Sequence, residues 1–394
     1  MIFTKIYIDN LYSFHDCTID LSIPDEEEYS TIPHEHLKGC EKFRFRRVCI
    51  ISGANASGKT ALGKILCNIQ NLWERYDSQV KLKTLSDILE TISDKSKAGK
   101  IEVEFVTSLK DKYYLNSFQM EIKPNKGIFD IISNSGLSSK IEIKIDDNIN
   151  SAREKLKNQK KEKNYFKLVT LPRAEEKRSW WFYVLSRNSD NNILSELMNK
   201  EILEKILLDM DSSIKNVENI KNDEFRIIFN NGDTLLFDRK GITDKDRLSA
   251  GTYDSLSIAI LLSVIIKHKK EDDKNKKTTH IYFLDEKMSR VHSELEISIL
   301  NLMINKLPHN AQLFYTTHNY DVVSDMNLPL YSYLFMGKEN GKTVIVQPEQ
   351  DKIMKKNKEK LLEFLKNDFF SILPSTKGID ELLFDEDNND LFGE

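Results

Sequence analysis

Hydrophobic positions along this chain alternate with polar ones in some stretches and recur at helical spacing in others. Residues 44–52 end in an almost unbroken apolar run, which predicts a strand buried on both faces, as in a parallel sheet. Residues 61–76 and 80–92 follow with apolar side chains at helical spacing. Alternation then predicts an antiparallel sheet with strands at residues 101–106, 113–122, 127–132 and 140–145.

The second half of the chain also mixes the two kinds of pattern. The turn sequence NNGD at residues 230–233 separates two short alternating stretches, which is typical of a β-hairpin. Helices are predicted at residues 191–210, 253–270 and 293–304, and apolar strands at residues 280–284 and 312–315. Buried strands that alternate with helices favour the α/β class.

Length, charge and hydropathy limit the class of protein. The chain has 394 residues, and at roughly 100–200 residues per domain we expect two to three structural units. Its 58 Lys and Arg against 62 Asp and Glu give a net charge of −4, which excludes nucleic-acid binding through bulk positive charge. The longest apolar run, residues 256–266, is too short to cross a bilayer, and the first residues lack a signal-peptide pattern. We therefore expect a cytoplasmic protein with no membrane partner.

Two segments depart from this even charge balance. Residues 151–167 contain seven Lys or Arg and two Glu, a net charge of +5. They predict a solvated helix or mobile arm, with a nucleic-acid contact or partner docking as the alternatives. The last 15 residues contain seven acids and no Lys or Arg, which predicts a disordered tail or, alternatively, a partner-binding peptide.

A glycine-rich segment carries the strongest chemical signal. Residues 53–60, GANASGKT, match the phosphate-binding pattern GxxxxGK[ST] between a predicted strand and a predicted helix. Glycines let the backbone surround a phosphate, and the amides at the start of the helix face its negative charge. Lys59 would neutralise phosphate charge and the Thr60 hydroxyl would bind Mg²⁺. The nucleotide-binding residues predicted from this segment are Gly53, Asn55, Ala56, Ser57, Gly58, Lys59, Thr60 and Ala61.

Three weaker signals follow along the chain. Ser249 and Gly251 open a predicted helix, where Ser is usually an N-cap and Gly lets an anion approach the first amides. Asp285 and Glu286 end an apolar strand; such acids are usually only solvated, but here they could hold Mg²⁺ and take a proton from attacking water. His318 follows another apolar strand, and a histidine in that setting is more often structural.

In this order, the four signals resemble the ATP-binding cassette (ABC) class of P-loop ATPases, in its soluble RecF- and SMC-like branch. A narrower match is to the ATPases of bacterial phage-defence operons of the AbiL and PtuA type. The stretches that carry the resemblance are IYIDNLYSF, GANASGKT, IEVEFV, KYYLNSFQMEI, LSAGT, IYFLDE, QLFYTTHNYDVVSD and FLKNDFFSILP. It runs to about residue 378 and is thinnest over residues 130–240.

The resemblance implies a role for each matched residue of an ATPase that uses ATP and Mg²⁺. Lys59 would contact phosphate, while Thr60 and Asp285 would hold the metal ion. Glu286 would be the catalytic base and His318 the switch histidine that senses the γ-phosphate.

The resemblance also implies a dimer. Ser249 and Gly251 match the signature segment, which in this class caps the γ-phosphate bound to the opposite subunit. The implied assembly is a head-to-tail homodimer that encloses two ATP molecules, with a higher assembly as an extension. Three positions depart from the class: Met288 and Ser293 replace the acid and the proline that usually follow the acid pair, and Tyr12 replaces an arginine.

Spacing and resemblance together give the expected fold. Thr60 and Leu248 are 188 residues apart (248 − 60), without heptads sustained enough for a coiled-coil arm. We predict the α/β class: a P-loop ABC-type ATPase head with a RecF/SMC-like mixed sheet and an antiparallel β lobe, plus an inserted α+β or helical lobe. The predicted divisions are the two halves of the head at residues 1–145 and 225–378, the inserted lobe at 146–224 and the acidic tail at 379–394.

Two functions fit such a head. The first is a nucleotide-gated dimeric switch in antiphage defence that controls a separately encoded effector, such as a nuclease or another toxin. The alternative is a RecF-like DNA-repair ATPase that clamps DNA when ATP is bound, with nucleic acid as its partner.

Overall fold

The structure is a computed structural model. It describes residues 1–23, 30–74, 78–109, 111–124, 136–163, 179–185, 198–221, 224–238, 241–272, 277–356, 360–368 and 379–380. The predicted strand at residues 127–132 and nearly all of the predicted acidic tail lie outside these residues. The described part is a mixed α/β fold with two six-stranded sheets, one four-stranded sheet and one two-stranded sheet.

The central sheet contains the strands that were predicted to be buried. Its order is β10 (Ser179–Val184), β15 (Thr279–Asp285), β16 (Ala311–Thr317), β5 (Val48–Gly53), β17 (Tyr333–Glu339) and β18 (Lys342–Val346). The first five strands are parallel and β18 is antiparallel to β17. Every residue of β5, β15 and β16 is buried, as expected for parallel strands that are covered on both faces.

A second, antiparallel sheet lies beside the central one. Its order is β2 (Cys17–Asp20), β1 (Ile2–Asp9), β6 (Gly99–Leu109), β7 (Lys112–Ile122), β8 (Gly136–Ile143) and β9 (Glu162–Lys163). The predicted strands 101–106 and 113–122 correspond to β6 and β7, and 140–145 overlaps β8, which begins and ends earlier. The predicted antiparallel sheet is therefore confirmed for its described strands.

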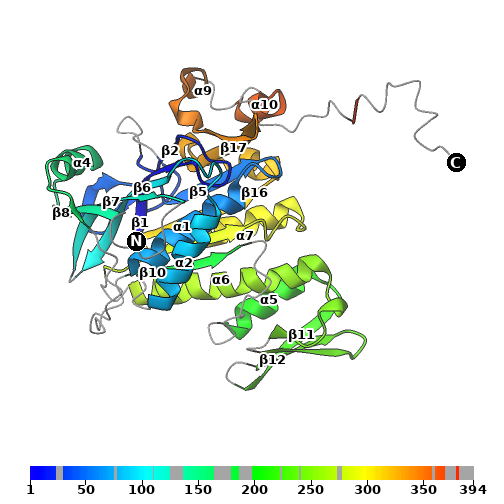
Figure 1. Cartoon of the computed structure of the whole chain (residues 1–394). Helices are drawn as coiled ribbons and strands as arrows, with labels where there is room; N and C mark the ends of the chain where they lie inside the picture. The colour runs from blue at the N-terminus through cyan, green and yellow to red at the C-terminus, as the bar shows by residue number, and fades with distance from the viewer. Residues whose placement is uncertain are drawn as a thin grey trace.

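Two helices fill the space between these sheets, α1 (Lys59–Glu74) and α2 (Ser78–Glu90) (Figure 1). The apolar positions of α1 recur at helical spacing and are fully buried: Leu62, Ile65, Leu66, Ile69 and Leu72. They pack in one core with side chains of the central strands and of the antiparallel sheet. This packing fixes the start of α1 at the end of β5.

The opposite face of the central sheet is covered by four helices. They are α5 (Lys200–Met210), α6 (Ala250–Asp272), α7 (Ser293–Lys306) and α8 (Tyr320–Asp325), and they share the largest core. By length and composition α6 could cross a membrane, but 61% of its apolar window is buried inside the protein. That burial is what a core helix of a folded domain shows.

A small third sheet lies next to α5, at the lower end of the molecule in Figure 1. It consists of β11 (Ile214–Lys221), β12 (Glu224–Phe229), β13 (Thr234–Asp238) and β14 (Gly241–Ile242). β12 and β13 pair with Phe225 opposite Phe237, so the predicted hairpin around NNGD is confirmed. The remaining elements are β3 (His36–Leu37), β4 (Cys40–Arg44), α4 (Ile149–Lys157), α9 (Lys352–Lys356), α10 (Leu361–Lys366) and short 3₁₀ turns.

Residues 146–224, predicted as an inserted lobe, contribute to three parts of the fold. α4 packs on β7 and β8, β10 pairs with β15, and α5 with β11 lies beside α6 and β12. The predicted domain boundaries stay a prediction.

The predicted helix is present as α4, and Lys155 and Lys157 on it are exposed, but its other face is buried. Ile149, Ala152 and Leu156 are buried against the outer face of the antiparallel sheet. Arg153 donates hydrogen bonds to Glu104 Oε2 at 2.7 Å and to Asp20 Oδ2 at 3.1 Å. The many Lys and Arg residues of this segment gave no sign of the apolar stripe of α4. They also gave no sign that Arg153 pairs with acids far away in the sequence. Residues 164–167 of the basic segment lie outside the described part.

Candidate functional site

Three neighbouring parallel strands bring the predicted site residues to one edge of the central sheet. β16 lies between β15 and β5. In its register Thr316 is opposite Asp285, and Thr317 is opposite Ser52. The carboxyl ends of the three strands therefore meet, and ligands of open α/β sheets bind at this end.

The loop that follows β5 is held by close backbone packing. A Cβ atom on Gly53 would lie 1.9 Å from the carbonyl oxygen of Met336, so no larger residue fits there. Gly58 has a φ of +113°, a conformation that only glycine adopts readily. The Thr343 hydroxyl on β18 donates to the carbonyl of Ser57 at 2.8 Å. A strand from the far end of the chain thus supports the glycine-rich loop.

Lys59 and Thr60 begin α1 directly beneath this loop. The Lys59 side chain is only 3% exposed, and its Nζ donates to the carbonyl oxygens of Gly53 at 2.8 Å and Ala54 at 3.0 Å. Thr60 Oγ1 donates to Asp285 Oδ2 at 2.8 Å. The glycine-rich segment and the predicted metal-binding acid are therefore in direct contact, although 225 residues separate them.

Asp285 is completely buried at the end of β15. Its Oδ1 accepts a hydrogen bond from Thr316 Oγ1 at 2.7 Å, and the amide of Glu286 donates to the same Thr316 hydroxyl at 3.0 Å. Glu286 has a φ of +52°, an uncommon conformation for a residue with a side chain. Strained positions of this kind concentrate at functional sites.

Glu286 contacts two basic side chains. Its Oε1 lies 2.9 Å from His318 Nε2 and 3.3 Å from Lys59 Nζ. The hydrogen bond from His318 lowers the pKa of Glu286 to about 2, although partial burial of the carboxyl group opposes this shift. Glu286 is thus ionised at neutral pH, and a proton acceptor must be ionised to act.

A cavity of about 670 Å³ opens over these residues. Its walls contain seven of the predicted nucleotide-binding residues: Asn55, Ala56, Ser57, Gly58, Lys59, Thr60 and Ala61. Glu286 also lines it, while Gly53, Asp285 and His318 contact lining residues from behind.

Five further residues line the cavity but were not among the predicted site residues. They are Tyr12, Ser13, Lys64, Lys338 and Gly341. Lys64 lies one helical turn after Thr60, so helical spacing could have found it. Lys338 and Gly341 come from the β17–β18 hairpin, and no local pattern links that hairpin to residues 53–60.

The structure does not bring Ser249 and Gly251 to this cavity. Ser249 Oγ accepts a hydrogen bond from the amide of Thr252 at 3.0 Å, which is an N-cap of α6. Asp254, near the start of α6, pairs with Lys287 at 3.0 Å. The signature-like segment is therefore tied to the residues that follow Glu286.

Met288 explains one departure from the class pattern. Its side chain is completely buried in the same core as side chains of α6 and α7. The position that carries an acid in the pattern of the ABC class is therefore an apolar core position in this chain.

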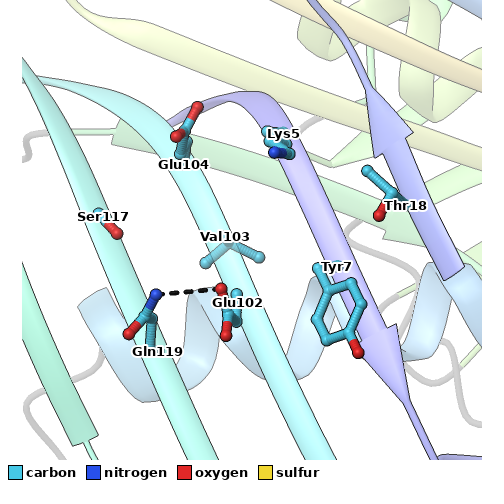
Figure 2. A pocket seen from close by; sticks show the side chains of 8 residues that line it. All are labelled: Lys5, Tyr7, Thr18, Glu102, Val103, Glu104, Ser117 and Gln119. Atoms are coloured by element: carbon cyan, nitrogen blue, oxygen red, sulfur yellow. Dashed lines mark hydrogen bonds between the residues drawn. The ribbon is translucent and has the colours of Figure 1, made fainter. Parts of the chain in front are cut away.

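A second, smaller hollow of about 140 Å³ lies on the outer face of the antiparallel sheet (Figure 2). Side chains of β1, β6 and β7 line it, and the amide of Gln119 donates to Glu102 at 3.0 Å. Burial and nearby acids, Asp9 first among them, raise the pKa of Tyr7 to about 12, so its hydroxyl stays protonated. None of the predicted site residues lies there.

Comparisons with known proteins add little to this geometry. No protein-family model matches the chain, and neither does any curated protein. Among solved structures the chain is similar to "the recombination mediator protein RecF-ATP in RecFOR pathway", with a TM-score of 0.39 and 13% identity over 88% of this chain and 97% of that one. A likeness this weak carries no argument, so the functional conclusion rests on the site.

The depressed pKa of Glu286 predicts a pH-dependent contribution to stability. Because this pKa falls from 4.5 to about 2, the ionised group stabilises the fold above pH 4.5, and this is lost as the pH falls towards 2. Glu286→Gln should lower the unfolding free energy by on the order of 1 kcal/mol at pH 7, since solvent screens the partly exposed pair, and by less at pH 3. Urea unfolding at both pH values measures this.

The matched control for this measurement is Glu154→Gln. Glu154 is an exposed acid in the middle of α4, and its replacement should have nearly the same effect at both pH values. An equal loss at pH 7 and pH 3 for Glu286→Gln would contradict the depressed pKa.

Proposed function

We propose that this protein binds and hydrolyses ATP as an ABC/SMC-like P-loop ATPase. The observation that carries the proposal is the convergence of Lys59, Thr60 and Asp285 with Glu286 and His318 around one cavity. Each residue type suits one part of phosphoryl transfer to water: a cation for phosphate, two oxygens for a metal ion, and a base.

The residues of the loop fit the phosphates of ATP. Backbone amides of residues 54–58 and the start of α1 supply donors and a positive dipole for phosphate oxygens. The ammonium group of Lys59 lies beside the loop, and it donates to the carbonyl oxygens of Gly53 and Ala54. Phosphate oxygens would replace those weaker acceptors.

The pair Thr60 and Asp285 fits Mg²⁺. Their side-chain oxygens are 2.8 Å apart, and hydroxyl and carboxyl oxygens are the ligands that this ion prefers. The ion would neutralise charge on the β- and γ-phosphates.

Glu286 and His318 fit the water-activation step. Glu286 is ionised, but His318 and Lys59 both contact its carboxylate. When phosphate oxygens take over Lys59, one of the two contacts that hold this carboxylate is weakened, and Glu286 becomes free to accept a proton from water. His318 would then turn towards the γ-phosphate.

The position of the signature-like segment outside the cavity supports a dimer. Ser249 and Gly251 do not line the cavity that contains Lys59, so a second chain placed head-to-tail would have to supply them. Asp254 and Lys287 connect that segment to the acid pair of its own chain, so each site would sense the state of the other.

The biological role that we propose is a nucleotide-gated switch in bacterial antiphage defence that controls a separately encoded effector. The support is the motif resemblance alone. Co-elution with the protein encoded beside this one, with and without ATP, tests it: no association in either state contradicts the role of a controller.

A RecF-like DNA clamp is the second candidate, and residues 151–167 motivate it. Lys157 and Lys160 are exposed, but Arg153 and Lys155 already pair with Asp20, Glu104 and Asp147 of the same chain. The positive charge of this segment that remains unpaired and could contact DNA is therefore smaller than the net charge of +5 counted from the sequence. Binding to DNA with ATP at low salt would favour this candidate over the switch.

Lys59→Ala should weaken ATP binding roughly 10–100-fold, because the phosphates lose a charge-assisted hydrogen bond in a buried place. Isothermal titration with ATP and Mg²⁺ measures the effect. Lys83→Ala, an exposed lysine on α2, is the control and should bind ATP as the wild type does. Equal affinities in the two variants would contradict the phosphate-binding assignment.

Glu286→Gln should bind ATP but hydrolyse it about 10²–10⁴-fold more slowly, the usual cost of losing a general base. ATP should then accumulate an assembly of twice the 45.9 kDa chain mass, seen by light scattering. Adding Lys59→Ala to this variant should abolish the dimer. Turnover at the wild-type rate would show that another group accepts the proton.

A further inference from the structure

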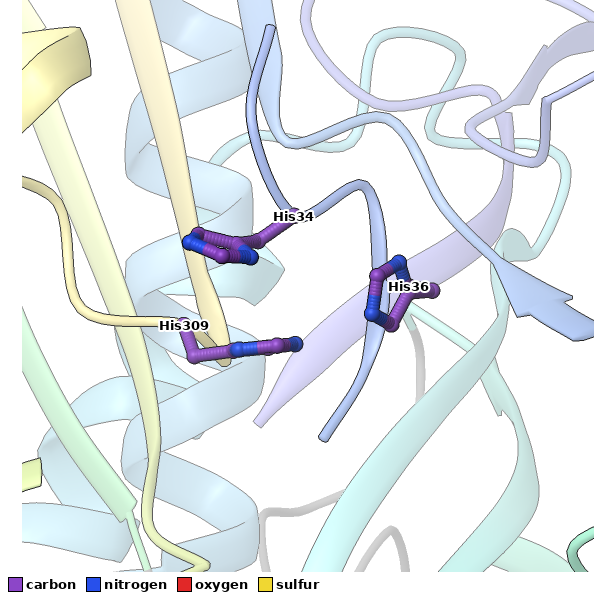
Figure 3. A group of neighbouring side chains, drawn as sticks. All are labelled: His34, His36 and His309. Atoms are coloured by element: carbon purple, nitrogen blue, oxygen red, sulfur yellow. The ribbon is translucent and has the colours of Figure 1, made fainter. Parts of the chain in front are cut away.

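A cluster of three histidines lies at the edge of the central sheet opposite to the candidate ATP site. His34 precedes β3, His36 is the first residue of β3, and His309 comes from the connection between α7 and β16 (Figure 3). His309 precedes the first residue of β16, whereas His318 follows the last one. The cluster is therefore separated from the ATP site by the length of a buried strand.

The three rings are in close contact. The centroids of His34 and His309 are 4.5 Å apart in a stacked arrangement, and those of His36 and His309 are 4.9 Å apart. One ring nitrogen from each histidine lies within 4.8 Å of the other two. Figure 3 shows the rings grouped from two backbone segments that are far apart in sequence.

A buried arginine holds the two segments together. Arg47, which is completely buried, donates hydrogen bonds to the carbonyl oxygens of Pro33, Leu307 and Pro308. These residues immediately precede His34 and His309. One rigid guanidinium group thus sets the distance between the two histidine-bearing backbones.

Two more backbone contacts fix the same region. The amide of His309 donates to Asp272 Oδ2 at 2.9 Å, and the amide of Lys38 donates to the side-chain oxygen of Asn310 at 3.0 Å. The cluster is consequently built on anchored backbone rather than on loose loops.

His309 has an unmet polar group. Its Nε2 is shielded from solvent and has no hydrogen-bond partner within the described residues. A buried nitrogen without a partner is costly, and such a group in a folded protein needs a reason.

We propose that His34, His36 and His309 together bind one zinc-type divalent ion. Imidazole nitrogens are the ligands that Zn²⁺, Co²⁺ and Ni²⁺ favour in proteins. Zn–N bonds of about 2.0–2.1 Å in a tetrahedral site place ligand nitrogens roughly 3.4 Å apart. To reach that spacing from the present limit of 4.8 Å, the stacked rings of His34 and His309 have to rotate so that their nitrogens converge. Three protein ligands leave the fourth position to water.

The His309 imidazole resists protonation. Burial lowers the pKa of His309 to about 3, and the neighbouring histidines and Arg47 add to this shift. The imidazole therefore stays neutral and keeps a lone pair for a ligand bond. Asp272, beside His309, supplies negative charge that partly offsets the repulsion between Arg47 and a divalent ion.

The site would fasten the segment around His34 and His36 to the connection before β16. Because it lies away from the ATP site, we expect the ion to stabilise the fold without taking part in ATP turnover. The full chain, stripped with a chelator, incubated with ZnCl₂ and desalted, should retain one zinc per chain by elemental mass spectrometry. Co²⁺ in its place should give the visible absorption of a tetrahedral complex, and zinc should raise the melting temperature.

The variants distinguish this site from other ways of holding zinc. His34→Ala, at an exposed position, and His309→Ala should lose the bound zinc, while His34→Cys, which keeps a ligand, should retain it. His15→Gln, outside the cluster, and Asp285→Asn, in the ATP site, should each still hold one zinc. No zinc on the wild-type chain, or zinc that survives His34→Ala and His309→Ala but is lost with Asp285→Asn, overturns the proposal.

Discussion

The hydrogen bonds to the buried carboxyl group of Asp285 determine where every other part of the candidate ATP site lies. Thr60 donates to one oxygen and Thr316 to the other. A carboxyl group without exposure must have such partners, because leaving one unpaired in the interior costs several kcal/mol. The two hydroxyls come from α1, which follows β5, and from β16, the strand between β15 and β5. Satisfying Asp285 therefore fixes the glycine-rich loop against the strand that carries the proposed base.

The contacts of Lys59 suggest how the proposed base, Glu286, could be regulated. Lys59 is buried and shares its ammonium group between loop carbonyls and Glu286. The carboxylate of Glu286 is in turn held by His318. The proposed base is thus neutralised by the group that would bind phosphate and by the histidine that would sense it. In the proposed ATPase such an arrangement would be inactive until phosphate oxygens compete for Lys59, which would couple water activation to occupancy of the site.

The sequence predicted those parts of the fold whose signal is local. A buried strand, a glycine turn and an apolar helical stripe adjoin one another around residues 53–60, and the acids and the histidine each follow an apolar strand directly. The structure places these residues at one sheet edge because parallel strands align their carboxyl ends. Sequence alone did not reveal the contribution of Lys338, since the β17–β18 hairpin reaches the loop only through tertiary packing. Sequence alone predicted a helix at α4 but missed its buried face, because the partners of Arg153 lie more than 40 residues away.

The histidine cluster was hidden for the same reason, since 273 residues separate His36 from His309 (309 − 36). Its relation to the ATP site follows from the strand that both share. β16 begins just after His309 and ends just before His318, and it is paired along both sides with parallel strands. A buried strand held by two ladders does not slide, because sliding would break both sets of hydrogen bonds at once. The proposed ion at one end would therefore hold the segment around His34 and His36 to the start of β16, while the state of His318 at the other end would depend on phosphate and on Glu286.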